Sequence, residues 1–211
     1  MRKSLFVIIF SICFIFAESV AAHPHAFIDM KSRVLVENNH LTGFSMQWLL
    51  DEPSSSQVLY DLMLASDEKA KQKLSDEIMQ NIIAEHYFSY LFNRRGEKIK
   101  YSAKPLHYGM RAEGTQVLYY FDFMLSEPVA LKSNSFILST YDPTYYVAML
   151  YDKGEKSADF SALPQNCRGE LQQPIVSSEL KAYALSLDKS QKDEDDTLGK
   201  QFAQQVVILC D

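Results

Sequence analysis

Two histidines flank a single proline in the stretch "AAHPHAFIDM", residues 21 to 30. Imidazole nitrogen is a ligand suited to Zn, Cu, Ni and Co. If His23 is the first residue of a processed chain, its amine and the imidazoles of His23 and His25 supply three nitrogen donors. Pro24 excludes the square-planar amino-terminal copper or nickel site, which needs the second residue's amide to lose a proton that proline lacks. The stretch therefore predicts either side-chain coordination of a metal, completed by other ligands, or only the polar start of a strand.

The residues before His23 have the pattern of a secretory signal peptide. Arg2 and Lys3 give a basic start, residues 5 to 16 are uncharged and apolar, and residues 20 to 22 are small. We expect residues 1–22 to be removed after Ala22, whereas a cut after Ala21 would leave Ala22 in front of His23. The apolar run is shorter than the roughly 20 residues that span a bilayer, so we expect no membrane insertion.

The net charge constrains the class of partner. The formal charge of the chain is -6, and the leader carries +1, so residues 23–211 carry -7. Nucleic acids and anionic membrane surfaces bind clustered Lys and Arg, so an acidic chain is a poor candidate for either. It is better suited to cations. The length of residues 23–211 predicts a single domain.

The cysteines agree with export. Cys13 lies in the leader, which leaves Cys167 and Cys210. In an oxidising compartment two cysteines most simply pair, and closing so long a loop contributes on the order of 4 kcal/mol. Two thiolates that bind a metal are the alternative, but the CxxC spacing of such sites is absent.

A strand is predicted at the start of the processed chain. Residues 26 to 36 place apolar side chains at even positions and charged ones at odd positions, and Asn38-Asn39 then turns the chain into a second strand over residues 41 to 50. Extended backbone at roughly 3.3 Å per residue puts His23 and His25 about 7 Å apart on the polar face. Asp29 shares that face, but about 13 Å of strand separates it from His25.

The next region changes to helical spacing. We expect two inserted helices over about residues 54–93, the second running from about residue 75 to 92, with residues 67 to 73 as a solvated connection. His86 lies within the apolar pattern of the second helix. It is therefore interpreted as a core or boundary histidine with a hydrogen-bonded ring.

Strand patterns return after residue 98. Asp122 is the polar exception within "VLYYFDFML" and needs a partner. The polar stretch of residues 186–199 predicts a mobile loop, followed by an amphipathic segment over residues 198–207 that brings Cys210 back to the body. Further strands are predicted at residues 115–125, 136–140 and 145–151. The sum is an α+β fold: antiparallel, sandwich-like β-sheets, an inserted pair of helices and a C-terminal segment stapled by a disulfide.

Several residues at predicted strand ends or in loops could complete a metal site at His23 and His25. His40 follows a turn and is assigned no role. The candidates are Asp51, Glu52, His107 and Asp142, and the sequence does not say which of them converge.

Four segments also resemble a known bacterial family. They are "HPHAFID" at residues 23 to 29, "WLLDE" at 48 to 52, "YDPTYYVAM" at 141 to 149 and "LGKQFAQQVVILC" at 198 to 210. Together they cover nearly the whole processed chain, and they are similar to a periplasmic family of unknown function that includes a ZevA-like component of a NicO-type transport system. The resemblance implies a periplasmic protein that handles zinc, or alternatively nickel or cobalt, beside an inner-membrane NicO-like permease.

The resemblance also implies candidate metal ligands. It carries over His23, His25 and Asp29, with Asp51, Tyr141 and Asp142 in addition, although Tyr141 and Tyr145 fit packing better than ligation. Many relatives have an acidic, glycine-containing stretch like a calcium loop after the DE motif. Here residues 64 to 77 lack glycine and alternating carboxylates, so we predict no calcium site.

Three classes of function stay open. The first is a metal-binding accessory of a transport system for zinc, or else nickel, cobalt or copper. The second is a protein-interaction module without metal, and the third is a copper enzyme that uses His23 as a bidentate ligand. No GxSxG, HExxH or phosphate-binding glycine motif is present, and we expect no enzyme.

Overall fold

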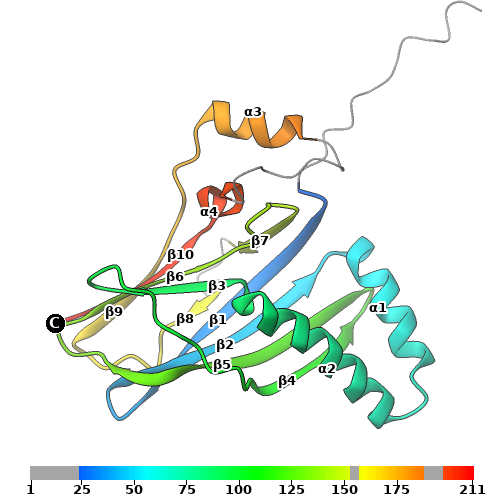
Figure 1. Cartoon of the computed structure of the whole chain (residues 1–211), viewed down its shortest axis with the longest axis horizontal. Helices are drawn as coiled ribbons and strands as arrows, with labels where there is room; N and C mark the ends of the chain where they lie inside the picture. The colour runs from blue at the N-terminus through cyan, green and yellow to red at the C-terminus, as the bar shows by residue number, and fades with distance from the viewer. Residues whose placement is uncertain (1–23, 153–156, 188–196) are drawn as a thin grey trace, which may run out of the picture.

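The computed structural model describes residues 24–152, 157–187 and 197–211, and His23 and the predicted signal peptide lie outside these ranges. The described chain is a mixture of strands and helices (Figure 1). The strands are β1 (Ala26–Glu37), β2 (His40–Leu50), β3 (Ser89–Asn93), β4 (Leu106–Glu113), β5 (Gln116–Ala130), β6 (Ser135–Thr140), β7 (Val147–Tyr151), β8 (Ala158–Asp159), β9 (Cys167–Gln172) and β10 (Gln205–Cys210). The helices are α1 (Glu52–Leu64), α2 (Glu68–Ala84), the 3-10 turn η2 (His86–Phe88), α3 (Ser178–Ser186) and α4 (Leu198–Phe202).

The larger sheet contains the predicted N-terminal hairpin. Its strand order is β4-β5-β2-β1-β7, and β8 also pairs with β1. Asn38 and Asn39 have φ of 49° and 59°, as a two-residue hairpin turn between right-twisted strands requires. The pairs along β4-β5-β2-β1 are antiparallel, whereas β7 and β8 run parallel to β1. The sequence prediction of antiparallel strands did not include these two parallel neighbours.

The smaller sheet holds the disulfide. Its order is β3-β6-β10-β9, and all its pairs are antiparallel. Cys167 and Cys210 are cross-strand partners at the end of the β9–β10 ladder, with Cα atoms 4.1 Å apart, and their sulfurs are bonded. The predicted disulfide is therefore confirmed, and it joins the last strand to the strand beside it.

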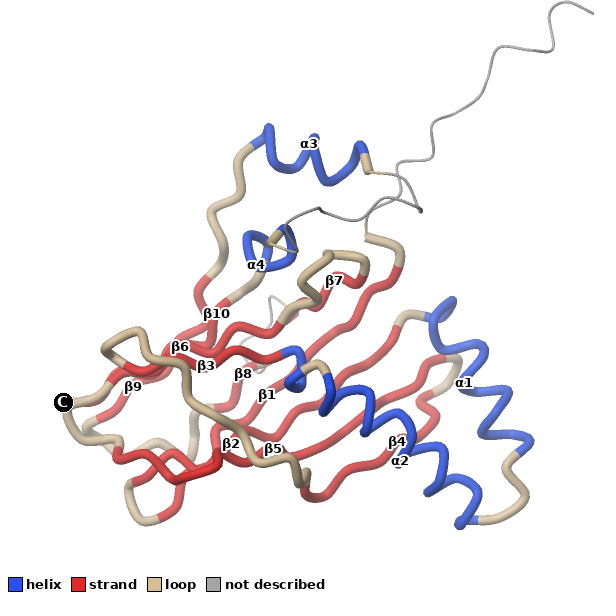
Figure 2. The backbone as a smooth tube through the Cα atoms, in the orientation of Figure 1, coloured by secondary structure: helices blue, strands red, loops and turns tan. Residues whose placement is uncertain are grey.

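The main hydrophobic core lies between the sheets and α2. Of the even positions of β1 that the sequence assigned to the core, Met30 and Val34 are 1 % exposed, whereas Ile28 and Val36 are half-buried. α2 covers the β4 side of the larger sheet, and the smaller sheet crosses the rest of the same face (Figure 2). The core includes Phe44, Trp48, Ile82, Tyr87, Leu91, Phe121, Phe123, Phe136, Leu138, Val206 and Ile208. The predicted α+β class with antiparallel sheets is confirmed.

The helical region begins and ends at other residues than expected. The stretch 67–73 is not a connection, because the Asp67 carboxylate caps α2 by accepting from the Ala70 amide at 2.8 Å. The second helix stops at Ala84 because His86, Tyr87 and Phe88 have φ of 52°, 57° and 49°. This left-handed turn buries Tyr87 and leaves His86 exposed, so the interpretation of His86 as a core or boundary residue was wrong.

The C-terminal region also differs in detail. The predicted amphipathic segment 198–207 is the short helix α4 followed by β10, and α3 was not predicted. Of the predicted loop 186–199, residues 188–196 lie outside the described ranges. Within those ranges, no helix is both long and apolar enough to cross a bilayer.

Candidate functional site

The first described residues are fixed at the start of β1. The His25 amide donates to the Tyr146 carbonyl at 2.8 Å, and the two rings pack with their centroids 4.6 Å apart. The next residue, Ala26, begins the parallel pairing with Val147. The turn before β7 thus sets the position of His25, and His23 lies two residues further, outside the described ranges.

Asp51 connects the same part of β1 to α1. Its Oδ1 accepts from the Ser54 amide and its Oδ2 from the Phe27 amide, both at 2.8 Å, while its own amide donates to the Phe27 carbonyl at 3.0 Å. Partial burial opposes ionisation, but the hydrogen bonds from Ser54 and Phe27 outweigh it, so the pKa of Asp51 lies below its ordinary value. The carboxylate caps the helix and anchors β1 at once.

Asp142 organises the turn before β7. Its Oδ1 accepts from the Thr144 amide at 3.0 Å, its Oδ2 accepts from the Val147 amide at 2.9 Å, and the Thr144 hydroxyl is 3.0 Å from both oxygens. A side chain on Gly199 would collide with the Asp142 carbonyl, so only glycine lets α4 approach this turn. Asp142 therefore fixes the segment that carries Tyr146.

Three of the predicted site residues consequently surround the start of β1. His25 bonds to the turn that Asp142 holds, and Asp51 bonds to the residue two positions after His25. Asp29 does not join them: it is exposed along β1 and lines a hollow with Lys31 and Arg111. In the described part of the chain, no group of three or more His, Cys, Asp or Glu side chains is arranged to hold a metal.

The tyrosines of the YDPTYY segment pack against other rings, as predicted. Tyr141 stacks on Tyr90 with centroids 4.6 Å apart, and Tyr145 stacks on Phe202 at 4.2 Å. Burial, with a smaller contribution from Tyr90, raises the pKa of Tyr141 to about 12. A neutral, packed phenol is a poor metal ligand, so these contacts favour packing over ligation.

Glu52 and His107, the other candidate ligands, lie in separate surroundings. The Glu52 carboxylate accepts from the Thr115 hydroxyl at 2.7 Å and ties α1 to the β4–β5 turn. His107 Nδ1 lies 2.9 Å from Asp122 Oδ2, so His107 is the partner that Asp122 was expected to need. The His107 side chain is 81 % exposed and that of Asp122 is 14 % exposed.

Sequence reasoning missed Tyr146 as the residue that holds His25. The signal was present, since both residues lie in the two most specific segments. Their contact follows from the parallel pairing of β1 with β7. The two strands lie more than a hundred residues apart in the sequence, so no local pattern reveals that they pair.

Comparison with known proteins places the chain in a family. Residues 8–210 match the model of a family described as "Protein of unknown function (DUF1007)". The chain belongs to this family. It is also 56 % identical, over 192 residues, to an uncharacterized protein of Haemophilus influenzae, an alignment that covers 91 % of this chain and 93 % of the relative. The matched range includes His25, Asp51 and Asp142, the three residues that surround the start of β1.

Proposed function

We propose that the protein is a periplasmic metal-binding accessory of a transition-metal transport system, with zinc as the ion. It captures or delivers the ion through the imidazoles of His23 and His25 at the processed N-terminus. The partner is an inner-membrane permease of the NicO-like kind that the sequence resemblance suggests. In this proposal the protein is not an enzyme.

The observation that carries the proposal is the fixed position of His25. The hydrogen bond from its amide to the Tyr146 carbonyl and the packing of the two rings hold one imidazole at the start of β1. A ligand whose backbone is already ordered loses less conformational entropy when it binds an ion. The start of β1 is thus a rigid base from which His23 can extend.

The nearby carboxylates favour a cation at the same place. Asp51 and Asp142 each accept hydrogen bonds from backbone amides, and each oxygen keeps further lone pairs. We propose that they position His25 and add negative charge, and that either can supply an oxygen ligand once the imidazoles hold the ion. Asp29 would require the bound N-terminal segment to bend back along β1.

The identity of the ion follows from ligand chemistry and availability. Nitrogen and oxygen donors bind Zn, Ni, Co and Cu, and intrinsic affinity is highest for Cu(II). Selectivity then depends on geometry and on which metal the compartment offers. A tetrahedral site with two imidazoles and one or two oxygens suits zinc. The disulfide between Cys167 and Cys210 suits an oxidising compartment such as the periplasm.

The proposal is tested by zinc titration of the chain that begins at His23. Calorimetry on the intact protein should show one site, and exchanging both His23 and His25 for Ala should lower its affinity by at least about tenfold, because two nitrogen ligands are lost. His40→Ala is the matched control, since this imidazole lies at the start of β2, after the β1–β2 turn, with Nδ1 2.8 Å from the Asn38 carbonyl. Equal zinc affinity in the double variant and the intact chain would overturn the proposal.

A further inference from the structure

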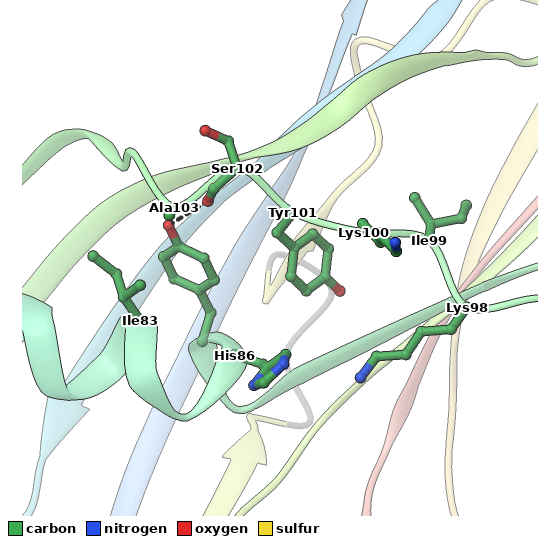
Figure 3. A pocket seen from close by; sticks show the side chains of 9 residues that line it. Ile83, His86, Lys98, Ile99, Lys100, Tyr101, Ser102 and Ala103 are labelled. Atoms are coloured by element: carbon green, nitrogen blue, oxygen red, sulfur yellow. Dashed lines mark hydrogen bonds between the residues drawn. The ribbon is translucent and has the colours of Figure 1, made fainter.

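A hollow lies away from the start of β1, beside the left-handed turn that follows α2. The hollow has a volume of about 380 Å³, and we call it the His86 pocket. Its walls come from the end of α2, from η2 and from the segment between β3 and β4 (Figure 3). The residues on which its chemistry depends are Ile83, His86, Tyr87, Lys98, Ile99 and Tyr101.

The turn that forms one wall is strained and firmly held. His86, Tyr87 and Phe88 all have positive φ, which is uncommon for residues other than glycine and costs free energy. The Tyr87 ring offsets this cost by stacking near Phe123, at 5.2 Å between centroids, and its hydroxyl donates to the Ser102 carbonyl at 2.9 Å. The result is that His86 is carried outward to the rim of the pocket, with an exposed side chain.

The polar side chains that line the pocket are those of His86, Lys98, Lys100, Tyr101 and Ser102. His86 and Lys98 reach the same space from opposite walls, and the Tyr101 hydroxyl points towards the gap between them (Figure 3). That hydroxyl is buried, and no group in the described ranges accepts a hydrogen bond from it. Lys98 Nζ lies 5.3 Å from the centre of the Tyr90 ring, which holds the ammonium near the pocket.

Apart from these polar side chains the lining is apolar, and this limits the kind of molecule that can bind. Ile83, Ile99 and the Tyr87 ring contribute hydrocarbon surface, and no carboxylate lines the pocket in the described part of the chain. Glu85 precedes His86 but is not a lining residue. A metal ion is a poor occupant, because a protonated lysine is not a ligand. A hollow of this size falls at the small end of ligand sites.

We propose that the His86 pocket binds a small organic carboxylate with an apolar body. The carboxylate lies between Lys98 and His86 and accepts a hydrogen bond from the Tyr101 hydroxyl, while the body packs on Ile83, Ile99 and the Tyr87 ring. This site is independent of the proposed zinc site, and it gives an otherwise acidic protein a place for an anion.

The test uses hexanoate as the probe and isoleucine methyl groups as reporters in NMR titrations of the processed protein. Hexanoate should shift the methyl signals of Ile83 and Ile99 and leave that of Ile175, which is fully exposed elsewhere. Lys98→Met and Tyr101→Phe should each weaken binding about tenfold, the effect expected from losing a charge-assisted or hydroxyl hydrogen bond to an anion. Lys69→Met, an exposed lysine on α2, should leave binding unchanged.

Two further probes separate the components of the site. Hexanol has the same body without the charge, and inorganic phosphate has charge without an apolar body, so both should bind at least about tenfold more weakly than hexanoate. The proposal is overturned if hexanoate does not shift Ile83 and Ile99, if Lys98→Met binds as tightly as the intact protein, or if phosphate binds as well as hexanoate.

Discussion

At the scale of single residues, Asp51 has a double role that its position in a "DE" pair did not indicate. The sequence suggested a candidate metal ligand, and the structure shows both oxygens occupied by backbone amides of Ser54 and Phe27. Because both bonds favour the ionised form, Asp51 contributes stability that is fully present above the ordinary pKa of aspartate. That contribution is lost as the pH falls through the lower pKa of the folded state.

Asp51→Ala should therefore lower the free energy of unfolding by about 1–2 kcal/mol at neutral pH, since a helix cap and a strand anchor are lost together. The difference from the intact protein should shrink below about pH 4, where the carboxyl group takes up a proton. Urea unfolding at several pH values measures both effects. Asp67→Ala is the matched control, because the Asp67 carboxylate caps α2 through the Ala70 amide alone. Its loss should lower the free energy of unfolding by less than the loss of Asp51. An equal loss in the two variants would contradict the anchoring role.

The hydrogen-bond partners of single polar side chains were the part of the structure that the sequence predicted least well. Asp122 was correctly expected to need a partner, and that partner is His107, which only the β4–β5 register brings near. His86 was misplaced because three successive left-handed residues ended the helix early. No glycine or proline marks this turn, so local sequence gave no sign of it.

At the scale of elements, α4 determines how the Asp142 turn sits behind the start of β1. Gly199 leaves no room for a side chain beside the Asp142 carbonyl, and its amide donates to the Pro143 carbonyl at 3.1 Å. Gly199→Ala should lower the free energy of unfolding by about 1–3 kcal/mol, because backbone must move to admit the methyl group.

Thermal or urea unfolding measures this loss. Lys200→Ala changes the next residue of the same helix, which is exposed, and should have little effect. If Gly199→Ala were as stable as the Lys200 variant, the close approach of α4 to the Asp142 turn would be wrong.

Elements with a strong local period were predictable, and those fixed by distant contacts were not. Alternating residues identified β1, and Asn38-Asn39 located the hairpin turn. The parallel pairing of β1 with β7 was missed, as was α3, whose apolar positions give it little amphipathic character. The site shares this pattern, because His25, Asp51 and Asp142 were all selected from sequence. The predicted β1–β2 hairpin brings Asp51 to the start of β1, whereas the Asp142 turn reaches it only through the parallel pairing with β7.

At the scale of the whole molecule, the disulfide and the candidate site mark two separated ends. β1 begins beside β7 and α1, while the C-terminus lies at the far end of the molecule, where β9 and β10 are joined (Figure 1). The 43-residue separation of Cys167 and Cys210 makes the disulfide a constraint mainly on the unfolded chain.

Reduction should lower the free energy of unfolding by about 4 kcal/mol in the chain-entropy picture. Urea unfolding with and without a thiol reductant measures it. The double variant Cys167→Ser, Cys210→Ser is the control. Its free energy of unfolding should equal that of the reduced protein, both with and without the reductant. Identical unfolding of the intact protein in both conditions would contradict this contribution.

We propose that the processed N-terminus binds zinc beside a fixed His25. Anomalous diffraction at the zinc edge, from crystals of the zinc-loaded chain that begins at His23, tests it most directly. The expected result is one strong peak about 2.0–2.1 Å from an imidazole nitrogen of His25, with His23 as a second ligand. A zinc peak only elsewhere, such as at the exposed His107, or no peak in a crystal grown with saturating zinc, would contradict it.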